Sequence, residues 1–225
     1  MKNLLSNKNL EFTNVKEEQL YSNVLDWGCG FGRATELLLK QDTKPKSYIG
    51  IEIDKERYNH CMKTFSKEKN CKFLWIPKND YIKHPTFGIK NPTYSIPVSG
   101  KSISLFLAYS VFTHLYYDQM QFFLKEIFKL LKDDGIAVTT WFLINRNIFP
   151  ILSEMQYCIY VNEFNSTQAI YVDFEQVKKM IDDAGLEIIK MRMPGVMGHQ
   201  AELFLAKKGV FKKEEIGIFK NIIGY

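Results

Sequence analysis

A short glycine-rich segment and a later acidic residue are the positions in this chain best suited to ligand chemistry. The segment Val24–Arg33 reads VLDWGCGFGR and contains Gly28, Gly30 and Gly32. Glycines let a backbone turn tightly and approach a ligand at the start of a helix. Glu52 follows twenty residues after Gly32, where a carboxylate can accept both hydroxyls of a ribose. The pattern predicts a site for a nucleoside-containing cofactor.

The glycine segment departs from the fingerprint of dinucleotide-dependent oxidoreductases. That fingerprint spaces its glycines as G-x-G-x-x-G after a strand. Here the third glycine, Gly32, comes one residue early, and Arg33 stands where the fingerprint has glycine. An acidic residue, Asp26, also precedes the loop. A dinucleotide oxidoreductase is therefore the weaker alternative.

Strands and helices alternate along the chain and would position these residues. Short aliphatic runs predict buried strands, and apolar residues at i, i+3 and i+4 predict amphipathic helices. The expected strands are Asn23–Trp27, Tyr48–Ile53, Cys71–Ile76, Ile103–Tyr109, Ile136–Leu143, Leu186–Met193 and Ala201–Lys207. The expected helices are Arg33–Gln41, Lys55–Lys67, Tyr117–Leu131 and Asp173–Ala184, with the third stopped by Asp133-Asp134-Gly135.

This alternation predicts βαβ units and an α/β fold, a single Rossmann-like doubly wound sheet of seven strands. About seven residues separate the last two strands, too few for a crossover helix, so these strands are expected to pair antiparallel. One domain spans 1–225, with a cofactor-binding core at 20–145, a helix and hairpin at 173–208 and a tail at 209–225. The tail could dock on the sheet or form a subunit contact.

The segment 146–172, after the fifth strand, is expected to be a lid insertion over the site. Connections of this length are uncommon and often functional. Its aromatic and acidic residues could clamp an acceptor, or the aromatic ones could fill a small core of the lid itself. These residues are Tyr157, Tyr160, Glu163, Phe164 and Tyr171.

Charge, cysteines and hydropathy exclude several classes. The net charge of +5 is spread along the chain, which favours a solvated surface over a nucleic-acid interface. The four cysteines have no zinc-ligand spacing, so neither a metal nor a disulfide framework is expected. No apolar run is long enough to span a membrane, and the N-terminus lacks a secretory signal pattern. We expect a cytoplasmic protein, monomeric or homodimeric, that contacts no membrane.

The order of four motifs resembles that of the class I S-adenosylmethionine-dependent methyltransferases. The glycine segment is followed by YIGIEID (Tyr48–Asp54), AYSVFTHL (Ala108–Leu115) and FLKEIFKLLKDDG (Phe123–Gly135). Many bacterial members of this superfamily carry a similar SVFTHL segment. The resemblance covers residues 20–145 by motif and 173–207 by strand order. It implies S-adenosylmethionine as cofactor and S-adenosylhomocysteine as product.

The resemblance also implies roles for individual residues. The glycine loop and the acid before it would hold the methionine end of the cofactor. The residues that would do so are Asp26, Gly28, Cys29 and Gly30. At the end of the second strand, Glu52 would bind the ribose and Ile53 would pack on the adenine.

The resemblance assigns two further pairs of residues. Asn79 and Asp80, after the third strand, would hold the adenine amino group. Tyr109 and Ser110, after the fourth strand, would lie near the sulfonium.

Methyl transfer from a sulfonium requires in-line alignment and exclusion of water, and the neutral leaving group needs no acid. A hydroxyl acceptor would need a base, and His199, His114 and Glu163 are the candidates. An amine or a stabilised oxyanion would need none. The predicted function is O-methylation of a small soluble acceptor, such as a sugar, a sugar nucleotide or a related metabolite. The alternatives are methylation of RNA or protein, and a non-catalytic module that binds the cofactor.

Overall fold

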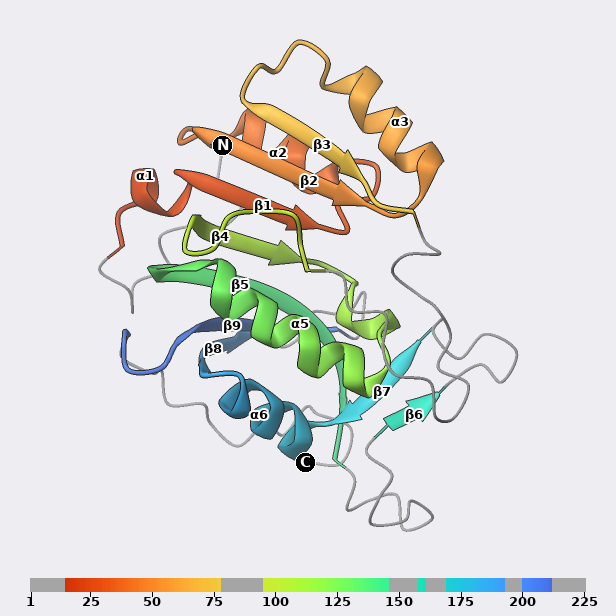
Figure 1. Ribbon diagram of the computed structural model, residues 1–225, viewed down its shortest axis with the longest axis vertical. Coiled ribbons are helices and arrows are strands. Elements are labelled where there is room, and N and C mark those ends of the chain that lie inside the picture. Colours follow the sequence, from red (N-terminus) through yellow and green to blue (C-terminus); the bar gives the residue numbers. More distant parts are fainter. Residues whose placement is uncertain (1–14, 78–94, 146–157, 161–168, 193–199, 212–225) are drawn as a thin grey trace.

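The computed structural model describes residues 15–77, 95–145, 158–160 (backbone only), 169–192 and 200–211. They form a nine-stranded sheet flanked by helices (Figure 1). The strands are β1 (Asn23–Trp27), β2 (Ser47–Glu52), β3 (Cys71–Trp75), β4 (Ile103–Ala108), β5 (Leu131–Ile144), β6 (Cys158–Tyr160), β7 (Ile170–Asp173), β8 (Leu186–Arg192) and β9 (Ala201–Lys207). The helices are α1 (Glu17–Leu20), α2 (Arg33–Lys40), α3 (Lys55–Thr64), η2 (Phe112–His114, a 3-10 turn), α5 (Tyr117–Leu130) and α6 (Phe174–Asp183).

The central part of the sheet is parallel and has the order β3-β2-β1-β4-β5. β9 pairs antiparallel with β5, and β8 pairs antiparallel with β9. The carboxyl ends of β1 to β4 lie along one edge of the sheet, where their arrowheads point to the same side in Figure 1. The expected Rossmann-like α/β sheet with an antiparallel closing strand is therefore confirmed.

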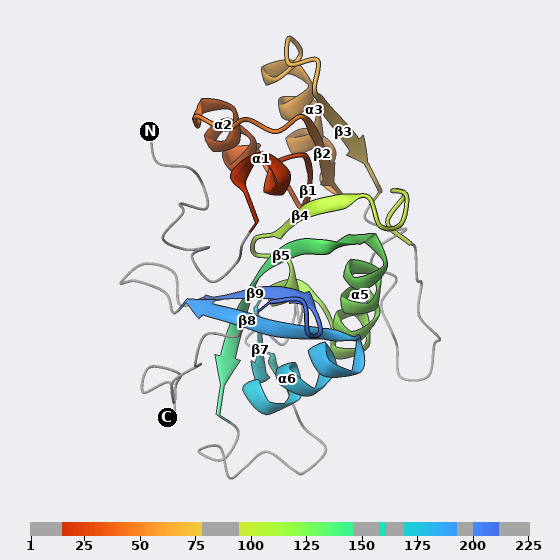
Figure 2. The same ribbon diagram turned by 90° about the vertical axis from the view of Figure 1, so that its left-hand side faces the viewer.

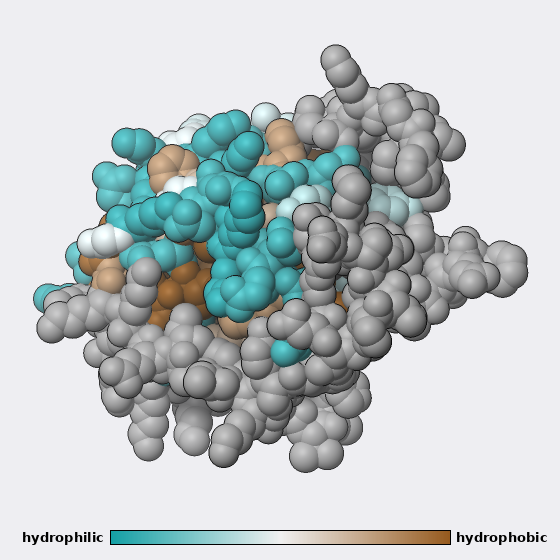
Figure 3. Space-filling view, turned by 90° about the horizontal axis from the view of Figure 1, so that it is seen from below, coloured by the Kyte–Doolittle hydropathy of each residue, from teal (hydrophilic) through white to brown (hydrophobic). Residues whose placement is uncertain are grey.

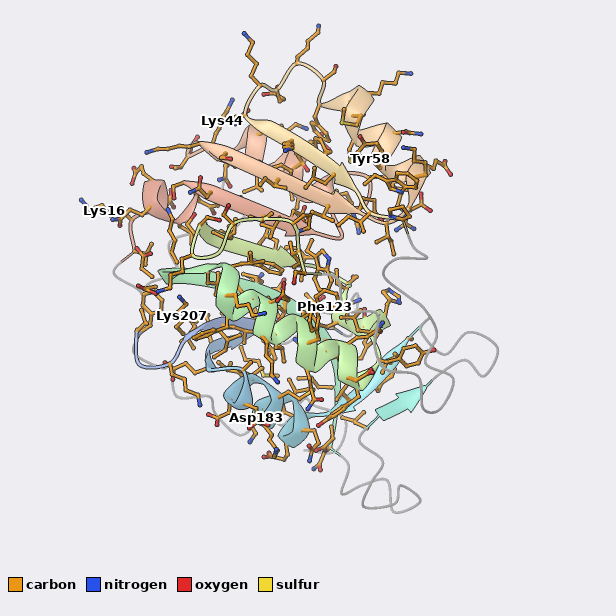
Figure 4. The ribbon with its side chains drawn as sticks, viewed as in Figure 1. Lys16, Lys44, Tyr58, Phe123, Asp183 and Lys207 are labelled. Atoms are coloured by element: carbon orange, nitrogen blue, oxygen red, sulfur yellow. The ribbon has the colours of Figure 1, made fainter. Side chains whose placement is uncertain are left out.

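Helices cover both faces of this sheet and separate two hydrophobic clusters. α5 and α6 pack over one face, where Phe123 lies 4.1 Å from the ring of Trp27. Figure 4 shows Phe123 on α5 in front of the strands. Leu38 of α2 and Cys61 of α3 belong to the cluster on the opposite face. Figure 2 shows the two layers, with α5 and α6 across the sheet from α1 and α2.

The helices begin and end where local chemistry favours it. The side chain of Asp54 caps α3 by accepting the Arg57 N–H, and Asp173 caps α6 by accepting the Gln176 N–H. Gly185 follows α6 with a φ of 81°, a conformation that glycine adopts at low cost. Seen from the end of the molecule that carries α6, the described surface is mainly hydrophilic (Figure 3). Among the described residues, no helix is long and apolar enough to span a bilayer.

The junction of α5 and β5 differs from the expected one. α5 ends at Leu130 and β5 begins at the next residue, so Asp133-Asp134-Gly135 lies inside the strand instead of between the two elements. A shift in the register between β4 and β5 accommodates the extra residues. Gly135 is required there because a Cβ would lie 2.8 Å from the Ile103 carbonyl oxygen.

Two strands lie within the segment expected to be a lid. β7 pairs in parallel with the end of β5, and β6 pairs antiparallel with β7. Part of the insertion therefore extends the sheet, which its sequence pattern did not predict. Residues 146–157 and 161–168 lie outside the described part of the chain, so a lid over the site stays a prediction.

Candidate functional site

The loop between β1 and α2 is held in place by its own backbone. The N–H groups of Gly28 and Cys29 both donate to the carbonyl of Ile51 in β2, at 2.8 and 3.0 Å. The N–H of Gly32 donates to the Cys29 carbonyl at 2.9 Å. The loop is thus tied to the neighbouring strand by bonds that need no ligand.

The three glycines of the loop meet different needs. Gly28, Gly30 and Gly32 have φ values of 80°, 59° and 79°. A Cβ at Gly28 would lie 2.6 Å from Cγ2 of Val111, and one at Gly32 would lie 2.4 Å from the ring of Phe65. A Cβ at Gly30 would meet no atom within 4 Å. Gly30 is therefore the position where the backbone is open to close approach by a ligand.

Glu52, at the carboxyl end of β2, has a carboxylate that backbone amides orient. Its Oε2 accepts the N–H of Gly30 at 2.7 Å, and its Oε1 accepts the N–H groups of Ile53 and Asp54 at 2.8 and 2.9 Å. The residue is 3% exposed. A carboxylate has about four lone-pair sites, two on each oxygen, so Oε2 keeps one site for a ligand hydroxyl. The structure brings Glu52 and the glycine loop together, as the sequence predicts.

Asp26 is a buried carboxyl group in β1, directly before the loop. The Tyr48 hydroxyl lies 2.9 Å from Oδ2 of Asp26 and 2.6 Å from Oγ1 of Thr35. When Asp26 is ionised, Tyr48 donates its only proton to the carboxylate, so Thr35 must donate to Tyr48. Burial raises the pKa of Asp26 from 3.8 to about 7, opposed by the Tyr48 hydrogen bond and reinforced by the charge of Glu52. No feature of the sequence indicated that Tyr48 and Thr35 have this role.

Cys29 and Ile53 present different groups to the site. The Cys29 side chain is buried in the cluster that contains Cys61, so only its backbone can face a ligand. A hydrogen bond with Cys61, together with burial, raises the pKa of the Cys29 thiol. Ile53 is half-buried, and its carbonyl accepts the indole N–H of Trp75 at 3.2 Å. Trp75 is 40% exposed at the end of β3, a position that sequence reasoning did not single out.

The turn after β4 places Ser110 beside β5 and the residue that precedes β9. Ser110 has a φ of 56°, which is unusual for a residue other than glycine. Its N–H donates to Oγ1 of Thr140 at 2.7 Å. The hydroxyls of Ser110 and Thr140 both donate to Oε1 of Gln200, at 3.1 and 2.7 Å. Burial and the charge of Glu202 raise the pKa of the adjacent Tyr109.

These two parts of the site lie side by side at the carboxyl edge of the sheet. Val111, which follows Ser110, packs against Gly28 so closely that no Cβ would fit there. Of the predicted catalytic residues, His114 lies in η2 just after this turn and is exposed. The other predicted site residues, namely His199, Glu163, Asn79 and Asp80, lie outside the described part of the chain.

Two further observations concern metal binding and a hollow elsewhere in the molecule. In the described residues, no group of three or more His, Cys, Asp or Glu side chains could hold a metal ion. A hollow of about 320 Å³ is lined by Asn23, Ser47 and Ser102, among others, near the amino ends of the strands. It lies at the opposite edge from the glycine loop and takes no part in the site.

Comparison with known proteins supports a methyltransferase. A family model described as a methyltransferase domain matches residues 25–139, just over half of the chain. Similar solved structures include a protein from Pyrococcus horikoshii, with a TM-score of 0.58 and 14% identity over 91% of this chain and 88% of that chain. A putative methyltransferase from Haloferax volcanii, solved with the activator Trm112, has a TM-score of 0.59 and 15% identity over 88% and 86%.

A third similar structure contains ligands. It is the 1,6-didemethyltoxoflavin-N1-methyltransferase from Burkholderia thailandensis, solved with 1,6-didemethyltoxoflavin and S-adenosylhomocysteine. Its TM-score is 0.57 and its identity 14%, over 86% of this chain and 72% of that chain. At these identities the similarity concerns the fold alone.

The described residues fit S-adenosylmethionine, the cofactor that the family and the fold support. The open backbone at Gly30 leaves room for close approach, and the oriented carboxylate of Glu52 can accept a ribose hydroxyl on Oε2. The motifs that resemble those of these enzymes lie on or beside β1, β2, β4 and β5, and these strands have the order β2-β1-β4-β5 in the sheet. The chain belongs to the methyltransferase domain family and has the fold of the class I S-adenosylmethionine-dependent methyltransferases.

Proposed function

We propose that this chain methylates a hydroxyl group of a small soluble acceptor, such as a sugar, a sugar nucleotide or a related metabolite. The observation that carries the proposal is the cluster of uncharged hydroxyl and amide groups next to the glycine loop. Ser110, Thr140 and Gln200 form this cluster, and Val111 connects it to Gly28. Such groups suit the uncharged, hydroxyl-bearing ring of an acceptor better than they suit a phosphate.

On the cofactor side, we assign binding and orientation to the residues of the chain. S-adenosylmethionine supplies a methyl group on a positively charged sulfur. Glu52 accepts a ribose hydroxyl through the remaining lone pair of Oε2, and Ile53 packs against the adenine. The open backbone at Gly30, together with Asp26 at the end of β1, receives the methionine end. Preorganised groups of this kind lower the barrier by fixing the reacting atoms in line.

On the acceptor side, a base would take the proton of the hydroxyl that receives the methyl group, while the carbon–sulfur bond of the cofactor breaks and leaves a neutral thioether. His114 is the described candidate, because it is exposed in the turn after β4. His199 directly precedes Gln200 in the sequence, and this supports it as the second candidate. Glu163 is the third.

A calorimetric titration with S-adenosylmethionine, S-adenosylhomocysteine and NADH tests the cofactor assignment. Micromolar binding of the two sulfur ligands without NADH binding supports it, and no binding of either sulfur ligand contradicts it. Release of S-adenosylhomocysteine is then measured with free hexoses, nucleotide-linked hexoses, an RNA and a peptide. Turnover with a sugar supports the proposal. Turnover with RNA or peptide alone replaces it, and binding without turnover favours a non-catalytic module.

One observation favours RNA as the second candidate. Phe31 and Trp75 are 50% and 40% exposed near the same edge of the sheet. Arg57 lies 5.6 Å from the Phe31 ring, and Lys55 lies 4.0 Å from the Trp75 ring. Exposed aromatic rings beside cationic side chains are typical of surfaces that stack single-stranded bases. If RNA is the acceptor, Trp75→Ala should reduce RNA methylation; if a sugar is the acceptor, the same variant should methylate it as the wild type does.

A further inference from the structure

The Gln200 side chain is oriented by hydrogen bonds from two segments, β5 and the turn after β4. Its Oε1 accepts hydrogen bonds from Thr140 in β5, at 2.7 Å, and from Ser110 after β4, at 3.1 Å. Thr140 in turn accepts the Ser110 N–H at 2.7 Å. Each hydroxyl has one proton, and both protons go to the same amide oxygen. The oxygen end of the amide therefore faces the cluster.

The other end of this amide is available to a ligand. Within the part of the chain that the structure describes, the NH₂ group of Gln200 donates no hydrogen bond. Gln200 is half-exposed, and Ser110 beside it is exposed. Two oriented N–H donors thus lie at the carboxyl edge, beside the turn that packs on the glycine loop. Donors of this kind recognise an oxygen atom that accepts hydrogen bonds.

An aromatic pair lies next to Gln200 on the same face of β5. Phe142 follows Thr140 by two positions, so the two side chains lie on one face of the strand, about 7 Å apart. β5 and β9 pair Thr140 with Glu202, so the same register places Phe142 opposite Gln200. Phe142 stacks on Tyr171 of β7, with ring centroids 4.8 Å apart and an angle of 20° between the rings. Both rings are half-buried.

The charged groups near this cluster neutralise each other. Glu202 accepts the Nε–H of Arg192 at 2.6 Å and forms an ion pair with its guanidinium. Arg192 also lies 5.9 Å from the ring of Phe204. The guanidinium is therefore engaged within the protein. An uncharged ring therefore suits these surroundings better than a phosphate does.

We propose that the Gln200 amide and the Phe142–Tyr171 pair bind the methyl acceptor and select an uncharged, oxygen-bearing ring such as a pyranose. The amide NH₂ donates to a ring hydroxyl or ring oxygen, and the stacked aromatic rings contact the ring face. Ser110 and Thr140 are positioning residues that hold the amide. This inference rests on the proposed function and adds the residues that determine specificity.

The test uses the full chain and the first hexose or nucleotide-linked hexose that the wild type methylates. Gln200→Ala should raise the acceptor KM about tenfold, the cost of one lost hydrogen bond, with kcat changed far less. Phe142→Leu should raise KM about fivefold through the lost aromatic contact. Binding of S-adenosylhomocysteine, measured by calorimetry, should stay within about twofold for both, which also shows that the variants fold.

Thr140 provides a matched pair of variants that separates positioning from packing. Thr140→Val removes the hydroxyl that holds the amide, and we expect KM to rise about threefold to fivefold, with Thr140→Ser restoring it. The control is Thr139→Val, because Thr139 is the adjacent residue and its Oγ1 accepts the Trp141 indole N–H instead. Thr139→Val should leave the acceptor KM unchanged.

Deoxy analogues of the acceptor identify the contact. The analogue that lacks the recognised hydroxyl should bind about tenfold more weakly to the wild type and no more weakly to Gln200→Ala. Unchanged acceptor KM in both Gln200→Ala and Phe142→Leu would overturn the inference while leaving the proposed function intact. If the wild type methylates no sugar of either kind, the proposed function fails, and the inference fails with it.

Discussion

The cofactor side and the acceptor side of the site are assembled over different sequence distances. On the cofactor side, Gly30 meets Glu52 and Tyr48 meets Asp26 across 22 residues in each case. On the acceptor side, Gln200 meets Thr140 across 60 residues and Ser110 across 90. The first set joins two neighbouring strands, whereas the second joins segments from three regions of the chain.

The two sides also differ in the groups that hold them. Backbone amides and carbonyls fix the glycine loop and the carboxylate of Glu52, so this side changes little with side-chain identity outside the motif. The acceptor side is held by side-chain hydroxyls and one amide. Substitutions there can alter the acceptor without affecting cofactor binding. Four predictions test this difference, from the largest expected effect to the smallest.

The largest effect is the pH dependence that Asp26 gives to stability. Burial raises its pKa to about 7 in the folded chain, against 3.8 as the ordinary value. Between these values the folded state binds more protons than the unfolded state, so stability falls as pH rises. Relative to Asp26→Asn, the wild type should lose on the order of 3–4 kcal/mol of unfolding free energy from pH 4 to pH 7.

Urea denaturation of both proteins at several pH values measures this difference. Asp54→Asn is the matched control, because Asp54 is an exposed acid close to the same loop. Its curve should run parallel to that of the wild type. If Asp26→Asn also runs parallel to the wild type, Asp26 does not titrate in this range and the buried carboxyl has been assigned wrongly.

The second prediction compares two glycines of one loop. Gly28→Ala forces a Cβ to within 2.6 Å of Val111 and keeps a φ of 80°, so we expect a loss of about 3 kcal/mol of unfolding free energy. Gly30→Ala meets no neighbour and should cost only about 1 kcal/mol, from its positive φ. Denaturation gives the stabilities, and calorimetry gives the affinity for S-adenosylhomocysteine.

Gly30→Ala is the milder change for stability, but we expect it to lower the affinity for S-adenosylhomocysteine. The added methyl group at Gly30 occupies the space where a ligand approaches the backbone, so Gly30→Ala should weaken binding in a chain that is still folded. Equal affinity of Gly30→Ala and the wild type would show that the open backbone there does not face the cofactor.

The third prediction concerns Glu52. Glu52→Ala should weaken binding of S-adenosylmethionine by about 1–3 kcal/mol, because the ribose diol loses its partner. Glu56→Ala, which removes an exposed acid from α3, should leave the affinity unchanged. Calorimetric titration of both variants distinguishes a contact from a general charge effect. An unaltered dissociation constant for Glu52→Ala rules out the ribose assignment.

The difference between the two sides also explains what the sequence could predict. The glycine loop and Glu52 were identified because their residue types and spacing are local, and the strand Ala201–Lys207 was predicted with its observed bounds. Gln200 belongs to no motif, and its position depends on the register of β9 against β5. That register arises from packing between distant segments, so periodicity does not reveal it.

Two further features were missed for related reasons. β7 is four residues long, and its own short pattern did not indicate a strand that pairs with the end of β5. Tyr48 reads as an ordinary core residue of a buried strand, and only the folded structure shows its hydroxyl on Asp26. A buried polar contact depends on which side chains meet across the sheet, and alternation of apolar residues predicts the face but not the partner.

The smallest effect comes from the strained turn on the acceptor side. Ser110 and Lys101 have φ values of 56° and 52°, a region that costs most residues about 1 kcal/mol. Ser110→Gly and Lys101→Gly should each raise the unfolding free energy by about 0.5–1 kcal/mol, measured by urea denaturation. Ser110→Gly also removes the hydroxyl that holds Gln200, so its acceptor KM should rise. Lys101 lies before β4 at the opposite edge, so Lys101→Gly should not change KM. If both variants gain stability and keep the wild-type KM, the strained conformation of Ser110 does not contribute to acceptor binding. The two sides of the site would then differ in how they are assembled but tolerate substitution equally well.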